Sequence, residues 1–224
     1  MKFLIISDLH AQVENLEKLE SQFKESDAVL FAGDFAKFAH TETGLPSLEK
    51  LCKMHETIFS VTGNCDETDF INETEKRDIS VEKQLVSFEG LMLTGSGGGS
   101  KFTGTTPNER TDEELYSDLH LVTEQGEQEW NNLIVLMHNP PKDTECDKIS
   151  NGMHVGSPLL KDFIEKYQPL LVVTGHIHES AGICKVGKST VVNPGALLEG
   201  KYATCEIIKT NGEWEVKNLE LKTL

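Results

Sequence analysis

The fold is decided by the stretch Phe3-Leu-Ile-Ile-Ser-Asp-Leu-His10, in which an uninterrupted apolar run ends in an aspartate and a histidine. Such a run is typical of a strand that is covered on both faces. Two later runs, Ala28–Ala32 and Thr57–Thr62, have the same character. Residues 13–23 and 48–52, which lie between these runs, have apolar side chains at helical spacing. This alternation predicts a parallel sheet with right-handed crossovers.

The middle of the chain is less regular. A hairpin that turns at Glu89-Gly90 is expected, and the segment from residue 95 to residue 110 is expected to be loop. The capping-box pattern Thr111-Asp-Glu-Glu114 predicts a helix over residues 112–125. Further on, we expect buried strands at Leu133–Met137 and Leu170–Thr174, and a helix that begins at Ser157-Pro158.

The C-terminal quarter is strand-rich. Thr190–Val192, Ala203–Ile208 and Trp214–Leu221 are predicted strands, and Asn211-Gly212 is a typical two-residue hairpin turn. No internal repeat or linker interrupts the chain. We therefore expect a single α/β domain over residues 1–224 that finishes in an antiparallel meander.

Five of the predicted strands end in side chains that can bind metals. Ligand sites in open α/β sheets lie just beyond the carboxyl ends of the strands, so these side chains should converge. They are too numerous for one tetrahedral zinc and suit two divalent ions that share a bridging carboxylate. In chain order they are Asp8 and His10, Asp34, Asn64 with Cys65 and Asp66, His138, and His176 with His178.

Each fragment also has a purely structural interpretation. Asp8-Leu-His10 could be a helix cap beside a surface histidine, and Gly33-Asp34 and Gly63-Asn64 could be ordinary turns. Gly175-His176-Ile-His178 is harder to explain in this way, because two imidazoles directly follow a buried strand. The occurrence of all five fragments at the same end of their strands favours a functional site.

The ordered set D-x-H, G-D, G-N-x-D, H and G-H-x-H resembles the calcineurin-like metallophosphoesterases over residues 3–195. The resemblance implies the metallophosphatase fold, a four-layer α-β-β-α sandwich of two mixed β-sheets flanked by helices. It also implies a dinuclear centre, in which Asp34 bridges the two metals. Gly-Asn-Cys-Asp66 and the segments around His138, His154 and Asn193 are similar to a small prokaryotic branch of the family. By position, Asp8, His10 and His178 would hold the first metal, and Asn64, His138 and His176 the second.

A dinuclear site of this kind suits phosphoester hydrolysis. Two cations about 3.5–4 Å apart bind a phosphoryl oxygen and lower the pKa of a bridging water, and the resulting hydroxide attacks phosphorus. Mixed nitrogen and oxygen ligands favour Mn2+, Fe, Zn2+ or Ni2+ over Ca2+, and Mn2+ is the ion expected to support activity in vitro.

Cys65 is a departure from the family pattern. Most members have a histidine there, which is thought to protonate the leaving group. A thiol is a poorer acid than imidazolium at pH 7, so we expect activity on esters with good leaving groups. Asp66 is expected to orient a neighbouring ligand or water. The expected catalytic residues are Asp34, Asn64, Cys65, Asp66 and His154, and the expected substrate contacts are Asn64, His154 and Arg110. His154 could equally be an ordinary loop histidine.

Two other patterns are judged to be coincidental. Gly182–Ser189 matches the Walker A motif, but Thr190-Val-Val follows where a helix would be required, so a hairpin turn at Gly187-Lys188 is predicted. Gly95–Gly99 lacks the helix start of a nucleotide-binding loop.

Composition restricts the partners. The 37 acidic and 21 basic residues give a formal charge of −16, which disfavours long nucleic acids. No apolar stretch is long enough for a membrane helix or a signal peptide, so we expect a cytoplasmic protein that acts on a small phosphorylated substrate. A homo-oligomer is left open. The alternative function is a non-catalytic protein-binding scaffold on the same fold. Scaffold relatives lack metal ligands, whereas all seven positions are filled here, and this favours the enzyme.

Overall fold

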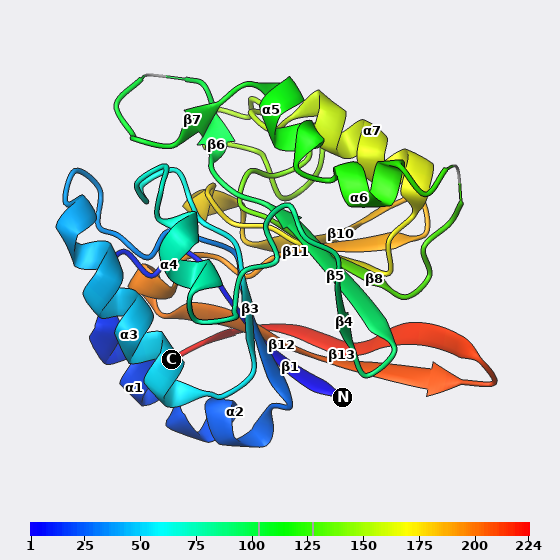
Figure 1. Ribbon diagram of the computed structural model, residues 1–224, viewed down its shortest axis with the longest axis horizontal. Coiled ribbons are helices and arrows are strands. Elements are labelled where there is room, and N and C mark those ends of the chain that lie inside the picture. The colour runs from blue at the N-terminus through cyan, green and yellow to red at the C-terminus, as the bar shows by residue number, and fades with distance from the viewer. Residues whose placement is uncertain (103, 127) are drawn as a thin grey trace.

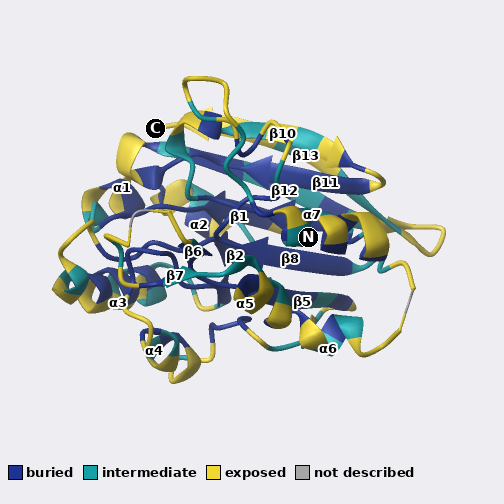
Figure 2. Ribbon diagram, turned by 90° about the horizontal axis from the view of Figure 1, so that it is seen from above, coloured by how far each residue is buried: buried dark blue, intermediate teal, exposed yellow. Residues whose placement is uncertain are grey.

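The computed structural model describes residues 1–102, 104–126 and 128–224. Two mixed β-sheets pack face to face, and helices cover the outer face of each sheet (Figure 1). This arrangement confirms the predicted four-layer α-β-β-α sandwich. In Figure 2, buried strands form the middle of the molecule, and the exposed residues lie mainly on the helices and loops.

The first sheet contains the N-terminal and C-terminal strands. Three parallel strands come from the predicted β-α-β-α-β segment, and the C-terminal hairpin adds two antiparallel strands beside β1. The order is β13-β12-β1-β2-β3, with β1 Lys2–Ile6, β2 Ala28–Phe31, β3 Ile58–Ser60, β12 Lys201–Thr210 and β13 Glu213–Thr223.

The second sheet has the order β10-β11-β9-β8-β5-β4. Its four inner strands are parallel, and an antiparallel strand closes each edge. The strands are β4 Val86–Phe88, β5 Leu91–Ser96, β8 Leu133–Met137, β9 Leu171–Val173, β10 Gly182–Val186 and β11 Ser189–Asn193. Two short parallel strands, β6 Gly99–Ser100 and β7 Glu109–Arg110, form a separate ladder.

The helices lie in two groups. The longest, α3 Gly44–Met54, lies with α1 and α2 outside the first sheet, and α7 Pro158–Tyr167 lies with α5 and α6 outside the second (Figure 1). The shorter helices are α1 Val13–Lys18, α2 Glu20–Glu25, α4 Ile71–Glu75, α5 Asp112–Ser117 and α6 His120–Thr123. No helix in the described ranges combines the length and apolar character needed to cross a membrane.

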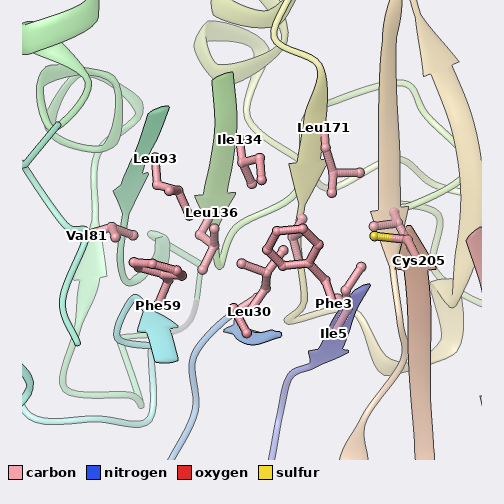
Figure 3. Close-up of a cluster of buried hydrophobic side chains, with 14 of the residues drawn as sticks. Phe3, Ile5, Leu30, Phe59, Val81, Leu93, Ile134, Leu136, Leu171 and Cys205 are labelled. Atoms are coloured by element: carbon pink, nitrogen blue, oxygen red, sulfur yellow. The ribbon is translucent and has the colours of Figure 1, made fainter. Parts of the chain in front are cut away.

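Three apolar clusters fill the three spaces between the layers. Side chains alternate across each strand, so Phe3 and Ile5 of β1 face the second sheet, while Leu4 and Ile6 face the helices. Figure 3 shows the central cluster, where Phe3 and Ile5 lie opposite residues of the second sheet such as Ile134. Strands covered on both faces need apolar residues at every position, which explains the continuous runs in the sequence.

Several local predictions are confirmed. Thr111 and Glu114 form the capping box at the start of α5, and the Ser157 side chain caps α7. Asn211 and Gly212, both with positive φ, connect β12 to β13. The Walker-like segment is a hairpin between β10 and β11 that turns at Gly187, whose φ is +58°.

Other expectations were wrong. The helix expected over residues 112–125 is two short helices, because the chain leaves helical geometry at Leu119, with φ −90° and ψ 14°. The predicted helix over residues 13–23 is likewise divided at Leu19. The segment from 95 to 110 is not all loop, because β5 continues to Ser96 and β6 and β7 follow; residue 103 lies outside the described residues. The C-terminal strands do not form one meander, because β11 pairs with β9 in the second sheet.

Candidate metal centre

The seven predicted ligands come together at one end of the two sheets. Asp8 and His10 follow β1, Asp34 follows β2 and Asn64 follows β3. The histidines from the second sheet follow β8 and β9, so both sheets direct their carboxyl ends toward the same place. The remaining three ligands are His138, His176 and His178.

The first group of ligands surrounds Asp8. The His178 Nε2 atom lies 3.3 Å from Asp8 Oδ1 and 3.1 Å from His10 Nε2. The oxygen and nitrogen atoms of these three residues lie within 4.8 Å of one another, which is close enough for one ion to contact them all. Deprotonated carboxylate and imidazole donors fit a divalent transition metal.

The second group adjoins the first through Asp34. His138 Nε2 lies 2.9 Å from Asn64 Oδ1 and 3.5 Å from Asp34 Oδ2. The same Asp34 Oδ2 atom lies 3.5 Å from His10 Nε2 in the first group. The imidazole ring of His176 completes this group, with its centroid 5.1 Å from that of His138. One carboxylate oxygen is therefore shared by the two groups of ligands.

The orientation of the imidazoles fits metal binding. His10 Nδ1 lies 3.0 Å from the Ala36 carbonyl oxygen, and His138 Nδ1 lies 2.7 Å from that of Ala32. A carbonyl oxygen only accepts hydrogen bonds, so each Nδ1 must carry a proton. The Nε2 atom of each ring is therefore the one left for a metal, and it lies among the other predicted ligands, 3.1 Å from His178 Nε2 in the case of His10 and 2.9 Å from Asn64 Oδ1 in the case of His138.

The charges show that the centre attracts cations. The nearby Asp34 and Asp8 carboxylates overcome the effect of burial and raise the pKa of His138 to about 9. Burial alone would raise the pKa of Asp34, but His138 and His10 hold it below its usual value. Burial and the adjacent His138 lower the pKa of His176 to about 4. Without metal, protonated His138 supplies positive charge to the buried carboxylates.

The backbone around the ligands is unusual. Asp8, His10, Asp34 and His176 all have positive φ, from 47° to 68°, a region that non-glycine residues seldom occupy. Such strain concentrates at functional sites, where the surrounding structure compensates for it. A Cβ atom on Gly63 would lie only 1.9 Å from Asp34 Oδ1, so the turn before Asn64 requires glycine.

Asp66 and Cys65 support Asp34 in different ways. The fully buried Asp66 carboxylate accepts hydrogen bonds from the backbone N–H groups of Phe35, Ala36 and Gly63, at 3.3, 2.8 and 2.8 Å. Burial and the nearby Asp34 raise the pKa of Asp66 to about 7. The Cys65 backbone N–H donates to Asp34 Oδ1 at 2.8 Å. Burial and the adjacent carboxylates raise the pKa of the Cys65 thiol, so it stays protonated.

The centre opens into a cavity of about 920 Å3. Its walls include the predicted ligands His10, Asp34, Asn64, His176 and His178, together with Cys65. The volume far exceeds that of a phosphate group and falls at the upper end of the range for small-molecule sites.

Two predicted residues are not among those that line this cavity, although their chain neighbours Glu109 and Val155 are. The Arg110 guanidinium forms an ion pair with the buried Asp118 and donates to the Gly97 carbonyl, so it is committed to the protein interior. His154 Nδ1 lies 2.7 Å from the Asp147 carboxylate, and the His154 side chain is not part of the cavity wall. Both side chains are thus engaged in ion pairs with buried carboxylates, and their predicted contacts with a substrate stay predictions.

Three supporting residues were missed from sequence. The Glu82 carboxylate accepts the Thr62 N–H at 2.7 Å, Asn108 Nδ2 donates to the Gly63 carbonyl at 3.1 Å, and Asn139 Oδ1 accepts the Ser100 N–H at 2.9 Å. Asn139 could have been found from the sequence, because it directly follows the predicted ligand His138. Glu82 and Asn108 lie in segments without a motif.

Residues 1–180 match the family model of the calcineurin-like phosphoesterases. The chain belongs to this family. An uncharacterized protein of Methanocaldococcus jannaschii, MJ1162, is 32% identical over 201 residues, which cover 87% of this chain and 88% of that protein. The human metallophosphoesterase domain-containing protein 1 is 26% identical over 86% of this chain and 65% of its own length.

Two solved structures share the fold. The protein TT1561 of Thermus thermophilus superposes with a TM-score of 0.69 at 18% identity, and covers 97% of this chain and 98% of its own. A dimetal phosphatase from Danio rerio superposes with a TM-score of 0.59 at 12% identity, and covers 100% of this chain and 98% of its own. At these identities the likeness extends to the fold alone. Family membership shows that the chain is a metal-dependent phosphoesterase.

Proposed function

We propose that this phosphoesterase uses two divalent metal ions to hydrolyse phosphodiester bonds of small molecules, with phosphomonoesters as less favoured substrates. The observation that carries the proposal is the position of Asp34 Oδ2, 3.5 Å from the Nε2 atoms of both His10 and His138. A carboxylate oxygen between two groups of nitrogen and oxygen donors suits a bridging ligand.

Each ligand has a role in holding the metals. Asp8, His10 and His178 would bind one ion, Asn64, His138 and His176 the other, and Asp34 both. When bound, the two ions would supply Lewis acidity toward a phosphoryl oxygen and lower the pKa of water. Mn2+ suits this mixed donor set, and Fe, Zn2+ or Ni2+ would also fit.

The chain supplies positioning around the metals. The Asp66 carboxylate and the Cys65 N–H hold the turn residues and the Asp34 side chain in place. The Asn64 side chain lines the cavity and is placed to contact a bound phosphate oxygen as well as a metal. Pre-organised polar groups of this kind lower the barrier because they need no rearrangement during the reaction.

The substrate preference follows from the acid and the cavity. The protonated Cys65 thiol lines the cavity where most family members have an imidazole, so substrates with good leaving groups should react fastest. A phosphodiester has two organic substituents on phosphorus and retains one of them through the reaction. The 920 Å3 cavity has room for both substituents. The dimetal phosphatase that shares this fold is consistent with a two-metal centre.

The test is hydrolysis of bis-p-nitrophenyl phosphate with and without Mn2+. We expect Mn2+-dependent turnover that falls at least a hundredfold in His176→Ala and Asp34→Asn, because each loses a metal ligand. His120→Ala, which replaces an exposed histidine on α6, is the matched control and should keep full activity. Absence of metal-dependent turnover in protein that binds metal would instead favour the alternative, a protein-binding scaffold.

A further inference from the structure

The cavity wall contains the two exposed aromatic side chains of the described chain. Phe38 is 54% exposed and Phe102 is 87% exposed, and both line the cavity that contains the metal ligands. Every other Phe, Tyr and Trp that the structure describes is buried or partly buried. An exposed ring forgoes the stabilisation that burial would bring, so two such rings in one cavity point to a ligand.

An ordered turn holds Phe38. The His40 N–H donates to the Lys37 carbonyl at 2.9 Å, and Ala39 has a φ of 59°. The Lys37 N–H donates to Thr43 Oγ1 at 2.9 Å, which ties the turn to the following helical segment. Phe38 is therefore at the tip of a fixed turn, four residues after the predicted bridging ligand Asp34.

A different device holds Phe102. The Glu109 carboxylate accepts backbone N–H groups from Phe102, Gly104 and Thr105, at 2.9, 2.9 and 3.0 Å. These hydrogen bonds overcome the opposing effect of burial and hold the pKa of Glu109 at about 2, so the carboxylate is charged throughout the physiological range. The Glu109 carboxylate therefore holds the backbone of Phe102 at the cavity.

The Phe102 loop is also joined to the metal centre. A Cβ atom on Gly99 of β6 would lie 3.1 Å from Asn64 Cβ and 3.3 Å from His176 Cε1, so the backbone of β6 packs directly against two predicted ligands. The Ser100 N–H is held by Asn139. The backbone that leads to Phe102 therefore starts at the predicted ligands, and Phe102 and the metal centre share one cavity.

We propose that Phe38 and Phe102 form a stacking platform for a planar heteroaromatic group, such as a nucleobase, on the substrate whose phosphate lies at the metal centre. This assignment rests on the proposed function and narrows its substrate class to nucleotide-like phosphoesters. Aromatic side chains stack on any base, since each base has a π-face, so the platform selects for ring character rather than for one base. The cavity is large enough for a base and a sugar beside the phosphate.

The test compares two ligands that differ only in the base. Adenosine 5′-monophosphate and ribose 5-phosphate are titrated by calorimetry into the Mn2+-loaded protein. We expect the nucleotide to bind at least about tenfold more tightly, from stacking on the two rings. The double variant Phe38→Ala/Phe102→Ala should lose this preference and bind ribose 5-phosphate as before, whereas Phe38→Tyr/Phe102→Tyr should retain it. Ile183→Ala, which truncates a 41% exposed side chain outside the cavity, is the control and should change neither affinity.

Equal binding of the two ligands by the unmodified protein would overturn the platform, as would an equal loss of both affinities in the double alanine variant. Turnover of bis-p-nitrophenyl phosphate in the same preparation separates this result from failure of the proposed function. Turnover without a nucleotide preference overturns the platform alone. A nucleotide preference without turnover supports the platform and overturns the hydrolase.

Discussion

Replacing Asp66 with alanine tests how the centre is supported. The variant leaves the N–H groups of Phe35, Ala36 and Gly63 without their acceptor in a fully buried position. Each unsatisfied donor costs about 1–3 kcal/mol. The loss is partly offset because the carboxylate is itself desolvated and lies near Asp34, as its pKa of about 7 indicates. We therefore expect a net destabilisation of about 3 kcal/mol, which for a chain of this size lowers the Tm by about 6–12 °C.

The same substitution should weaken metal binding. Phe35 directly follows the predicted ligand Asp34, and Gly63 directly precedes the predicted ligand Asn64. Loss of the hydrogen bonds from the Phe35 and Gly63 N–H groups should therefore make the positions of Asp34 and Asn64 less fixed. Loss of a supporting contact of this kind lowers metal affinity by about 10–100-fold. Thermal unfolding of the metal-free protein and calorimetric titration with Mn2+ measure the two effects separately.

Asp147→Ala is the matched control. The Asp147 carboxylate is also fully buried, and it accepts the N–H groups of Asp143, Thr144 and Gly156, yet it contacts none of the seven predicted ligands. Asp147 also pairs with His154, and this contact and the backbone N–H groups overcome the opposing effect of burial and lower its pKa. This variant should therefore lower the Tm at least as much as Asp66→Ala and leave the Mn2+ affinity unchanged. The reasoning is refuted if Asp66→Ala binds Mn2+ as tightly as the unmodified protein, or if both variants lose affinity to the same extent.

Three further predictions concern residues around the centre. Arg110→Met should destabilise the protein by about 2–3 kcal/mol, because the buried Asp118 loses its guanidinium partner and keeps only Lys83 at 3.9 Å and the Ser96 hydroxyl, and KM should not change; an increase in KM without loss of stability would support the predicted substrate contact of Arg110. Cys65→Ser should keep turnover within about threefold, because the protonated thiol is not a nucleophile, and covalent labelling by iodoacetamide should be slow in the unmodified protein. Mn2+ affinity should rise with pH up to about 9, since Mn2+ competes with the proton that His138 holds below its pKa of about 9; calorimetry in buffers of different ionisation enthalpy should detect proton release, and an affinity independent of pH would contradict this role.

The positions of the predicted ligands could be anticipated from sequence because each one directly follows a buried strand. Parallel strands bring their carboxyl ends to one edge, so Asp8, Asp34 and His138 come together even though they are far apart in the chain. The continuously apolar runs predicted strands covered on both faces, whereas the two-sheet sandwich was implied only by the resemblance to the family.

The surroundings of the centre could not be anticipated in this way. The partner of Arg110, Asp118, is eight residues further along and directly follows α5, and no local motif links the two. Glu82 and Asn108 support the turn before Asn64 through tertiary contacts that no local motif encodes. In the sequence, Phe102 does not differ from the phenylalanines of the core. Its exposed ring becomes evident only in the structure.

The most direct test of the two-metal centre is anomalous diffraction at the manganese edge from crystals grown with Mn2+. The account predicts two peaks in each molecule, one among Asp8, His10 and His178 and one among Asn64, His138 and His176, with Asp34 in contact with both. A single peak, or peaks that leave Asp34 without a metal, would contradict it.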